Sequence, residues 1–491
     1  MTVLHPAPVP RLPGLPLDRV VIGAEVSVPL TLLDQAQLDD LGKRLRFENP
    51  DYTYQVKLRG RSTLPPEFDL SRRTGEHLFL PRGLAEVVEG FGLPMSDQTT
   101  APVLRRPLAL RDLVLRPDQE QALAALTSWP CGMLRAPTGF GKTVTALGLI
   151  AHLGLRTLVL VANGKRALLQ QWVDALERST DLAPTELGIL GDGKRTFGEV
   201  TVALPQTLSN LLREGGCLPD FGLVLCDECH ASTVLHLQQL YPHLPAARRY
   251  GISATPERDD HLHDLPALVF GPIRHVIDDR EAVERHLITR FRVVRRETGL
   301  GFAYRFGNDL RNYRVLQRNI YGNAKRNELL SKDLEELLRQ RRRTLVIVER
   351  LVHIHHLQKL LRGRPEVAAI TGETATPERD QLLEAFRHGE LLAILTTDQI
   401  FREGIDLPNL ECILLPLLRQ GELALTQAIG RGRRLHEDKD VCTVVDYVDR
   451  GPKPEQLWKK KLQHVYLGQE ILELGAEGSL ASLFNPSLPR P

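Results

Sequence analysis

Short apolar runs alternate with longer segments of helical periodicity over most of the chain beyond about residue 107. Runs of strand length fall into two groups, with an interruption near residues 278–287. The expected strands are residues 132–135, 157–162, 200–204, 223–226 and 249–253 in the first group, and 344–348, 367–370, 392–395, 411–415 and 441–445 in the second. Because strands that alternate with helices form parallel sheets covered by helices, the pattern predicts two α/β domains.

We place the first α/β domain at residues 108–285 and the second at residues 286–450. Residues 1–107 are expected to form a small amino-terminal α/β module behind a proline-rich leader, and residues 451–491 a carboxy-terminal extension. Six cysteines in 491 residues indicate no disulfide framework, and no apolar run approaches membrane-spanning length. We therefore expect a cytoplasmic, monomeric enzyme with no membrane partner.

A candidate phosphate-binding loop spans residues 136–143, Ala-Pro-Thr-Gly-Phe-Gly-Lys-Thr. It follows an apolar run and opens into a helix-like segment, which is the context in which such loops work. Glycines let backbone N–H groups converge on phosphate oxygens, and the helix N-terminus adds a partial positive charge. We expect Lys142 to reach the β- and γ-phosphates and Thr143 to bind Mg²⁺. The cofactor-binding residues expected in the loop are Pro137, Thr138, Gly139, Gly141, Lys142 and Thr143.

Two carboxylates, Asp227 and Glu228, follow the apolar run at residues 221–226. A pair at the carboxyl end of a strand can hold the Mg²⁺ shell through Asp227 and polarise the attacking water through Glu228. Residues 226–230 also spell Cys-x-x-Cys-His, a pattern of haem, zinc and redox sites. We reject those sites because no second Cys-x-x-Cys exists and Cys226 falls on a strand that should be buried. The loop and the carboxylates together indicate an ATPase that uses ATP and Mg²⁺.

Further motifs follow in a fixed order between about residues 115 and 449. They are Leu-Arg-Pro-Asp-Gln at residues 115–119, Ser-Ala-Thr at 253–255, a glycine- and aspartate-containing run at 396–408, and Gln-Ala-Ile-Gly-Arg-Gly-Arg-Arg at 427–434. The ordered set resembles the superfamily 2 helicases and translocases, which implies two tandem RecA-like domains. Residues 255–260 and the amino-terminal region look most like the XPB, UvsW and RadD-like branch, although Arg-Asp-Asp stands at residues 258–260 where XPB-type proteins have Arg-Glu-Asp.

The resemblance implies roles for the matching residues. Those implied to contact the nucleotide outside the phosphate loop are Arg116, Gln119, Gly404 and Asp406. Those implied to act in catalysis, besides Lys142, Asp227 and Glu228, are Gln427, Arg431 and Arg434, the two arginines in the finger positions. Arginines can neutralise charge that develops on the γ-phosphate, whereas a solvated arginine cluster is the alternative.

Nucleic acid is the expected partner, although a net charge of +2 does not indicate it. The backbone contacts that the family implies are Lys165, Arg166, Gln206, Thr207, Arg350 and Thr396. Residues 163–166 read Asn-Gly-Lys-Arg and depart from the usual start of their motif. The phosphate contact there can therefore come from Lys165 or Arg166, or from Asn163 and backbone N–H groups.

The amino-terminal module resembles a small damage- or branch-recognition module found ahead of such helicase cores. Between residues 43 and 73 it carries eight Lys/Arg and four Asp/Glu, a balance of +4. Tyr52, Tyr54 and Phe68 are interleaved among these basic residues, so they could stack on bases. They could equally form the core of a small α/β domain. Both interpretations stay open from the sequence.

These observations predict an ATP- and Mg²⁺-dependent DNA helicase or duplex translocase that remodels branched or damaged DNA. Two alternatives stay open: an RNA helicase, and an ATP-gated nucleic-acid clamp that does not unwind. The sequence shows no nuclease, methylase or zinc module. We therefore expect a nuclease or another repair or defence protein to supply any activity beyond remodelling.

Overall fold

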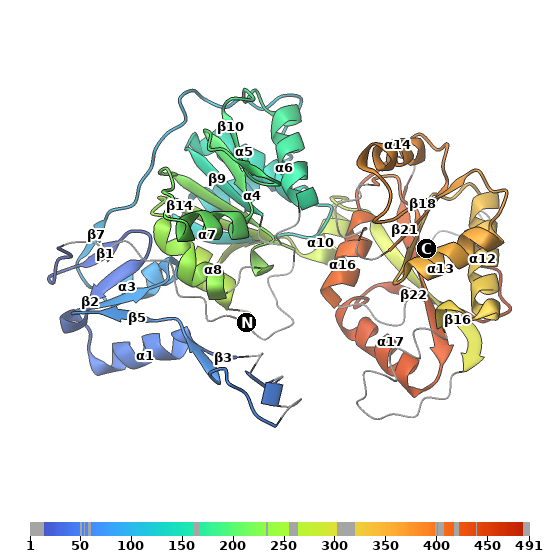
Figure 1. The fold of residues 1–491 in the computed structure, drawn as a ribbon, viewed down its shortest axis with the longest axis horizontal. Coiled ribbons are helices and arrows are strands. Elements are labelled where there is room, and N and C mark those ends of the chain that lie inside the picture. Colours follow the sequence, from blue (N-terminus) through green and yellow to red (C-terminus); the bar gives the residue numbers. More distant parts are fainter. Residues whose placement is uncertain are drawn as a thin grey trace. The chain divides into compact units, whose positions relative to one another are not determined.

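The chain is described by a computed structural model. It covers residues 14–49, 52–53, 55–56, 60–161, 166–231, 234–254, 264–301, 320–397, 400, 407–416, 422–437 and 439–484. Two compact units are present (Figure 1). The first comprises residues 1–137 and 141–278, and the second comprises residues 279–491 with the short segment 138–140.

The first unit begins with the amino-terminal module, whose described residues form a sheet in the order β5-β6-β2-β1-β7. Its strands are β1 (Val20–Ile22), β2 (Val26–Pro29), β5 (Arg72–Thr74), β6 (His77–Leu80) and β7 (Met95–Asp97). Helix α1 (Gln35–Leu45) starts with a capping box at Asp34 and buries Leu41 and Leu45. A separate hairpin joins β3 (Arg46–Glu48) to β4 (Glu67–Asp69). The module is therefore an α/β fold, as predicted.

The module continues directly into the packing of the first α/β domain. Its last helical turns are η2 (Arg82–Leu84) and α3 (Ala85–Glu89), and η2 lies against α9 (Leu265–Phe270) of the domain. A Cβ atom on Gly83 would lie 2.0 Å from the carbonyl oxygen of Ala267, so only glycine fits at this contact. Aliphatic side chains of the module and of the domain share one hydrophobic cluster.

Two arginines of the domain reinforce this contact. Arg249 is fully buried and donates to the carbonyl oxygen of Ala24 at 3.0 Å. Arg274 forms an ion pair with Glu86 of α3 and stacks over the ring of Trp129. Buried hydrogen bonds and shared apolar packing join the module and the first domain in one compact unit.

The first α/β domain contains a sheet in the order β11-β10-β12-β9-β13-β14-β8-β15 within the described chain. All neighbouring pairs are parallel except β10 and β11. The strands are β8 (Cys131–Arg135), β9 (Thr157–Val161), β10 (Leu187–Gly191), β11 (Lys194–Arg195), β12 (Val200–Ala203), β13 (Leu223–Asp227), β14 (Arg248–Ser253) and β15 (Ile273–Val276). Their helices are α4 (Pro117–Thr127), α5 (Lys142–Leu153), α6 (Arg166–Ser179), α7 (Pro205–Arg213), α8 (Val234–Gln239) and α9.

The second unit is built on a wholly parallel sheet, in the order β18-β19-β17-β20-β21-β16-β22 for the residues that are described. The strands are β16 (Arg290–Gly301), β17 (Thr344–Val348), β18 (Val367–Ile370), β19 (Ala393–Thr397), β20 (Cys412–Leu415), β21 (Val441–Arg450) and β22 (Glu470–Leu474). The helices are α10 (Asp279–Glu284), α12 (Ala324–Arg339), α13 (Leu351–Leu360), α14 (Thr376–Arg387), α16 (Glu422–Arg431) and α17 (Pro452–His464).

Side-chain alternation along these strands gives the second sheet two buried faces. Leu345 and Ile347 of β17 pack in one cluster with residues of α14, α16 and α17, whereas Val346 and Val348 pack in another with residues of α12 and α13. A strand buried on both faces reads as a continuous apolar run, which is why β17 and β20 could be predicted. The ten predicted strands are present, with ends shifted by a few residues at most except β21, which runs on to Arg450. Strands β10, β11, β15, β16 and β22 were not predicted.

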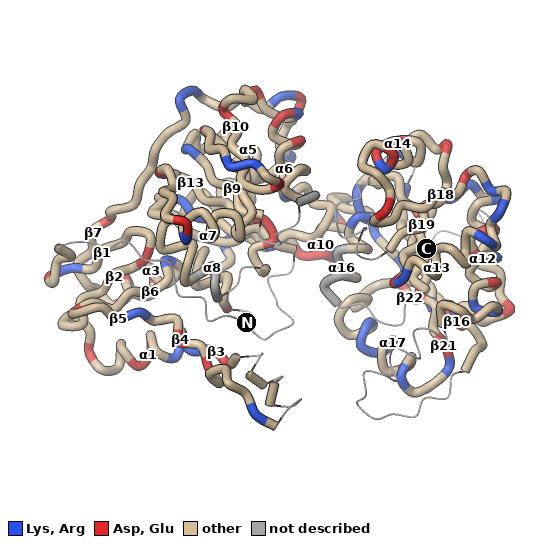
Figure 2. The backbone as a smooth tube through the Cα atoms, in the orientation of Figure 1, with Lys and Arg blue, Asp and Glu red and all other residues tan. Residues whose placement is uncertain are grey.

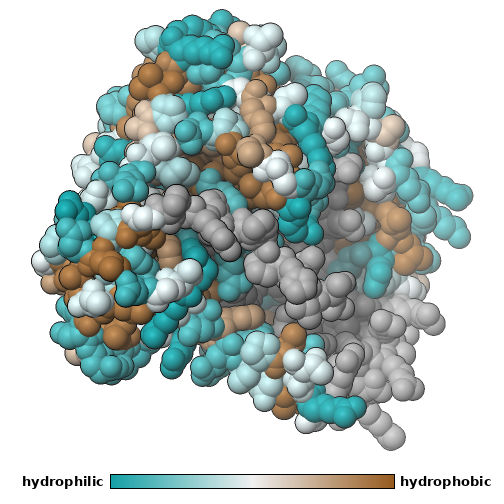
Figure 3. Space-filling model, turned by 60° about the vertical axis from the view of Figure 1, so that its left-hand side comes forward, coloured by the Kyte–Doolittle hydropathy of each residue, from teal (hydrophilic) through white to brown (hydrophobic). Residues whose placement is uncertain are grey.

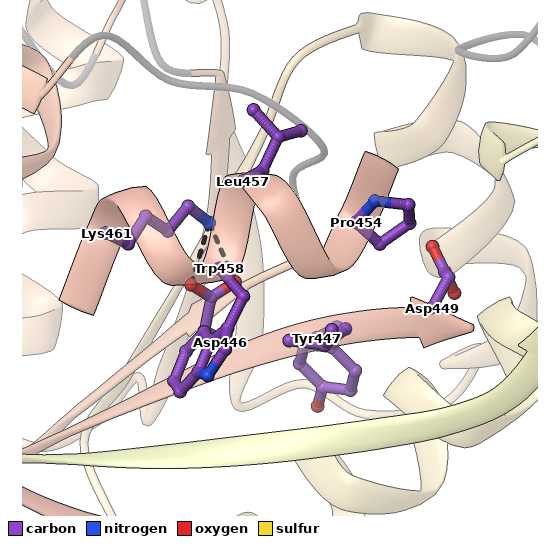
Figure 4. A pocket seen from close by; sticks show the side chains of 8 residues that line it. Asp446, Tyr447, Asp449, Pro454, Leu457, Trp458 and Lys461 are labelled. Atoms are coloured by element: carbon purple, nitrogen blue, oxygen red, sulfur yellow. Dashed lines mark hydrogen bonds and ion pairs between the residues drawn. The ribbon is translucent and has the colours of Figure 1, made fainter. Parts of the chain in front are cut away.

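Polar groups also hold the second sheet and its last helix together. Lys461 of α17 donates to both carboxylate oxygens of Asp446 on β21, at 3.0 and 2.7 Å (Figure 4). The hydroxyl of Tyr466 donates to the same carboxylate at 2.9 Å. The last lysine of the basic run at residues 459–461 is thus a structural residue, whereas Lys459 and Lys460 are exposed. Blue segments in Figure 2 show that α17 carries basic residues.

On the face drawn in Figure 3, apolar and hydrophilic side chains are interspersed over the described surface. Among the described helices, none has the length and apolar character needed to cross a membrane.

Candidate nucleotide site and nucleic-acid interface

The phosphate loop connects β8 to α5, whose first residue is Lys142. Gly139 and Gly141 have φ angles of 93° and 95°, values that strain any residue with a side chain. Their backbone N–H groups can therefore turn toward one point in front of the helix N-terminus. The Nζ atom of Lys142 donates to the carbonyl oxygens of Ala136 and Pro137, at 3.2 and 3.4 Å, and lies within its own loop. Thr143 is half-buried in the first turn.

The predicted base-reading residues lie at the start of α4. The Oε1 atom of Gln119 accepts from the backbone N–H of Arg116 at 3.0 Å, and a Cβ atom on Gly141 would lie 2.6 Å from Gln119 Nε2. Gln119 is therefore held against the phosphate loop. The guanidinium of Arg116 is paired with buried Asp118 at 3.1 Å, which fixes its position beside Gln119.

The two predicted catalytic carboxylates lie at the carboxyl end of β13. Because β13, β14 and β8 are adjacent and parallel, this end shares one edge of the sheet with the phosphate loop. The Oδ1 atom of Asp227 accepts from the backbone N–H of Glu228 at 2.9 Å, and Oδ2 accepts from Trp172 Nε1 at 2.8 Å. Glu228 has a φ angle of 51°, a left-handed conformation that is uncommon for a residue other than glycine and recurs at functional sites.

The surroundings of Asp227 suit a divalent cation. Burial and, to a smaller extent, the neighbouring charge of Glu228 together raise the pKa of this carboxyl to about 6, while Trp172 and Lys142 oppose the shift. A buried carboxylate whose negative charge is poorly compensated gains from a nearby cation. The residues present therefore fit Mg²⁺, held by Asp227 and by the hydroxyl of Thr143.

The carboxylate pair is connected to the next strand of the sheet. His230 Nδ1 lies 2.9 Å from the hydroxyl of Ser253, at the end of β14, and 3.3 Å from Glu228 Oε2. The carbonyl oxygen of Ser253 accepts from the N–H of Ala136, where the phosphate loop begins. His230 and Ser253 thus connect the Glu228 carboxylate to the loop. Thr255, the last residue of the Ser-Ala-Thr motif, lies outside the described residues.

The cysteines of the Cys-x-x-Cys-His pattern lie in the core. Cys226 and Cys229 are both fully buried. Burial raises the pKa of the Cys229 thiol well above its usual range, so this side chain is a neutral thiol. Both residues therefore pack as small apolar groups.

The structure distinguishes among the arginines at the end of α16. Arg433 is buried, pairs with Asp279 at 2.5 Å, donates to the carbonyl oxygen of Thr289 at 3.3 Å and stacks over Phe291. Its contacts stabilise the start of the second domain. Arg431 and Arg434 are half-buried.

Three other predicted residues of this domain are not covered. Gly404, Asp406 and the side chain of Gln427 lie outside the described part of the chain.

The predicted nucleic-acid contacts divide by exposure. Gln206 is exposed and Thr207 half-exposed in the first turn of α7, and Arg350 is exposed at the N-cap of α13. Thr396 is fully buried in β19, so its side chain does not reach the surface and the expected contact is not supported. Lys165 and the side chain of Arg166 lie outside the described residues.

Tyr52 and Phe68 of the amino-terminal module are half-buried and are not among its buried core residues. That core is mostly aliphatic, with Phe79 of β6 also buried. Tyr54 lies outside the described residues. Arg44, Arg46 and Arg72 form ion pairs with carboxylates of the module, which reduces the positive charge available to a ligand.

The sequence pattern does not predict Trp172 as a site residue. Its contact with Asp227 joins residues 55 positions apart along the chain. The sequence gives one local sign of this role: a tryptophan at a position that fits the buried face of an amphipathic helix.

Two protein-family models match the chain. One is described as "Type III restriction enzyme, res subunit" and matches residues 112–258, and the other is "Helicase conserved C-terminal domain" and matches residues 328–436. The two matches fall on the two predicted α/β domains.

Curated relatives carry helicase and translocase names. "DNA 3'-5' helicase XPB" of Kineococcus radiotolerans is 28% identical over 60% of this chain and 52% of its own length. "Putative DNA 3'-5' helicase Rad25" of Haloarcula marismortui is 28% identical over 79% of this chain and 60% of its own length. "DNA 3'-5' translocase XPB2" of Sulfurisphaera tokodaii is 23% identical over 74% of this chain and 87% of its own length. The chain spans little more than half the length of the first two.

Solved structures share the fold. A fragment of a putative HsdR subunit of a type I restriction enzyme from Vibrio vulnificus has a TM-score of 0.54 at 19% identity, covering 74% of this chain and 69% of its own. S. cerevisiae Dbp5 bound to RNA and ADP–BeF3 has a TM-score of 0.52 at 16% identity, covering 81% of this chain and 94% of its own. The predicted fold class, two tandem RecA-like domains, is confirmed.

Proposed function

We propose that the chain is an ATP- and Mg²⁺-dependent DNA helicase or duplex translocase of superfamily 2, because the two family models match both α/β domains and relatives named XPB are similar to it. The observation that carries the proposal is the carboxylate pair at the end of β13, on the same sheet edge as the phosphate loop. That juxtaposition supports a single site in which one group polarises water and another binds phosphate.

In this function each group of the first domain has a separate task. The N–H groups around Gly139 and Gly141 and the Lys142 ammonium bind the phosphates. Asp227 and Thr143 would hold Mg²⁺, which would neutralise negative charge on the phosphates. Glu228 orients the attacking water and accepts its proton, while His230 holds the Glu228 side chain beside Ser253. Gln119, fixed against the loop, contacts the base.

We assign Arg431 and Arg434 of the second domain to stabilising the charge that develops on the γ-phosphate. The support is the resemblance of residues 427–434 to the arginine-finger motif of the helicases. Within this run the guanidinium of Arg433 is bound to Asp279 and Thr289. A fixed, buried arginine cannot reach a nucleotide without breaking these bonds. Arginines in such a role act mostly on the transition state.

We further propose DNA as the polymer that is moved, held through its backbone by Gln206, Thr207 and Arg350 and by the start of α6. Hydrogen bonds to phosphates carry no base information, so binding should be insensitive to sequence and sensitive to salt. Preference for branched DNA is assigned to the amino-terminal module. Tyr52 and Phe68 are outside its buried core, which leaves part of each ring accessible.

The test measures ATP hydrolysis with duplex DNA, branched DNA and RNA, together with strand displacement on forked and junction substrates. Lys142→Ala and Glu228→Gln should each abolish DNA-stimulated hydrolysis and leave DNA binding near the wild-type level. If RNA but not DNA stimulates ATP hydrolysis, the proposal is wrong and the chain is an RNA helicase. If DNA stimulates ATP hydrolysis without strand displacement or translocation, the chain is an ATP-gated clamp.

A further inference from the structure

Trp172 lies on the buried face of α6, about two turns from the start of that helix, and its side chain is 3% exposed. Its indole N–H is directed at Oδ2 of Asp227, 2.8 Å away. The donor comes from a different element than the acceptor, so the bond joins α6 to the carboxyl end of β13. Nothing in the apolar packing of an indole requires its N–H to face a carboxylate.

This bond, together with a second one from the backbone, fixes the orientation of the Asp227 carboxylate. Oδ1 is already held by the backbone N–H of Glu228, so each oxygen has one donor inside the protein. A carboxylate held at both oxygens has its plane and rotamer defined. Each oxygen still has a second lone-pair direction, and these are available to a cation or to water bound to it.

An indole is well suited to this position. It donates one hydrogen bond and accepts none, so it cannot compete for the cation as a ligand. It carries no charge at any pH, whereas a lysine or arginine here would repel Mg²⁺. Its large apolar ring fills the space between α6 and the sheet, which keeps the N–H in one place.

We propose that Trp172 is a positioning residue that holds the Asp227 carboxylate in the orientation needed to bind Mg²⁺ with the nucleotide. The inference rests on the proposed ATP site and adds to it a residue that does not itself touch nucleotide or metal. Partners that orient metal-binding carboxylates in this way are typically worth 10- to 100-fold in metal affinity.

The direct test compares ADP affinity with and without Mg²⁺, measured calorimetrically on the full chain. In the wild type Mg²⁺ should tighten ADP binding, and in Trp172→Phe this tightening should fall by about tenfold while Mg²⁺-free affinity is unchanged. Trp458→Phe is the matched control, because Trp458 is also buried but lies in the second domain against Tyr466. The control should keep the full effect of Mg²⁺.

A purely structural role for Trp172 predicts a different result. Phenylalanine would then lower stability, and any loss of affinity would appear equally with and without Mg²⁺. That outcome, or a wild-type response to Mg²⁺ in Trp172→Phe, would overturn the inference. A wild-type protein in which Mg²⁺ has no effect on ADP binding would instead overturn the proposed ATP site itself, and the positioning role with it.

A second measurement observes the hydrogen bond without substituting the tryptophan. The chain has three tryptophans, so ¹⁵N-labelled indole groups give three N–H resonances. Asp227→Asn should shift the resonance of Trp172 and leave those of Trp129 and Trp458 in place. If the Trp172 resonance stays unchanged, the N–H is not bonded to Asp227 and the inference fails even where Trp172→Phe does not fold.

Discussion

Replacing His353 should make the free energy of unfolding of the second domain less sensitive to acid. His353 lies fully buried on α13, where its Nε2 atom is 2.9 Å from Asn327 Oδ1. Burial lowers the pKa of His353 from 6.5 to about 3, and the positive charge of Arg326 adds to the effect. A histidine with a lowered pKa contributes stability that is present above pH 6.5 and is lost as pH falls, because the unfolded chain takes up the proton first.

The size of the effect follows from these two values. Between pH 7.5 and pH 5.0 the unfolded state becomes almost fully protonated at this position while the folded state stays neutral. The free energy of unfolding should therefore drop by about 2 kcal/mol through His353 alone. His353→Gln keeps a donor toward Asn327 and has no proton to gain, so its stability should fall by about 2 kcal/mol less over the same range.

The assay is urea unfolding at the two pH values, followed by the fluorescence of Trp458 in the second domain. Trp129 and Trp172 are changed to phenylalanine in both proteins, which leaves one reporter in the domain that contains His353. Other titrating groups cancel in the difference between the two proteins. Equal losses of stability on acidification would show that His353 protonates inside the fold, and the reasoning from its burial would be refuted.

Three further predictions concern single features of the two units. Arg433→Ala should destabilise the second domain by about 2–4 kcal/mol, because it removes the side-chain partner of Asp279 and Thr289. Arg431→Ala should instead keep the wild-type thermal stability and lower ATP turnover at unchanged ATP affinity. Equal melting temperatures of the two variants would contradict this difference. Gly83→Val should detach the amino-terminal module from α9, and proteolysis of the module should then be faster than in the wild type. A protease pattern identical to that of the wild type would count against the contact. Cys229 should resist alkylation in the folded protein at pH 8, and rapid modification would show that it is not buried.

Local chemistry in the sequence was enough to predict the phosphate loop and the carboxylate pair. Gly141 and Lys142 act through the backbone turn and the helix that immediately follow them, so neighbouring residues contain the information. The buried strands were equally accessible, because a parallel strand covered on both faces is a continuous apolar run. Strand β16 is long but carries four arginines, and its polar sequence did not indicate a buried strand. Three of them, Arg292, Arg295 and Arg296, bind residues that are distant in the sequence.

What could not be predicted depends on contacts between distant residues. Arg431, Arg433 and Arg434 stand in one short run, and only the fold shows that Arg433 is bound to Asp279. The contact between Trp172 and Asp227 could not be predicted either, because residues so far apart in the sequence form no local pattern. Thr396 matched a motif but is fully buried, because the motif begins inside a strand whose last residues are still covered.

The shared packing of the amino-terminal module and the first domain has a mechanical consequence. Arg249 enters the module from the amino end of β14, the end opposite to the one that carries the nucleotide site. The module is therefore attached at the end of the sheet opposite to the one that carries the proposed ATP site. DNA bound by the module, as proposed above, would follow the first domain and not the second.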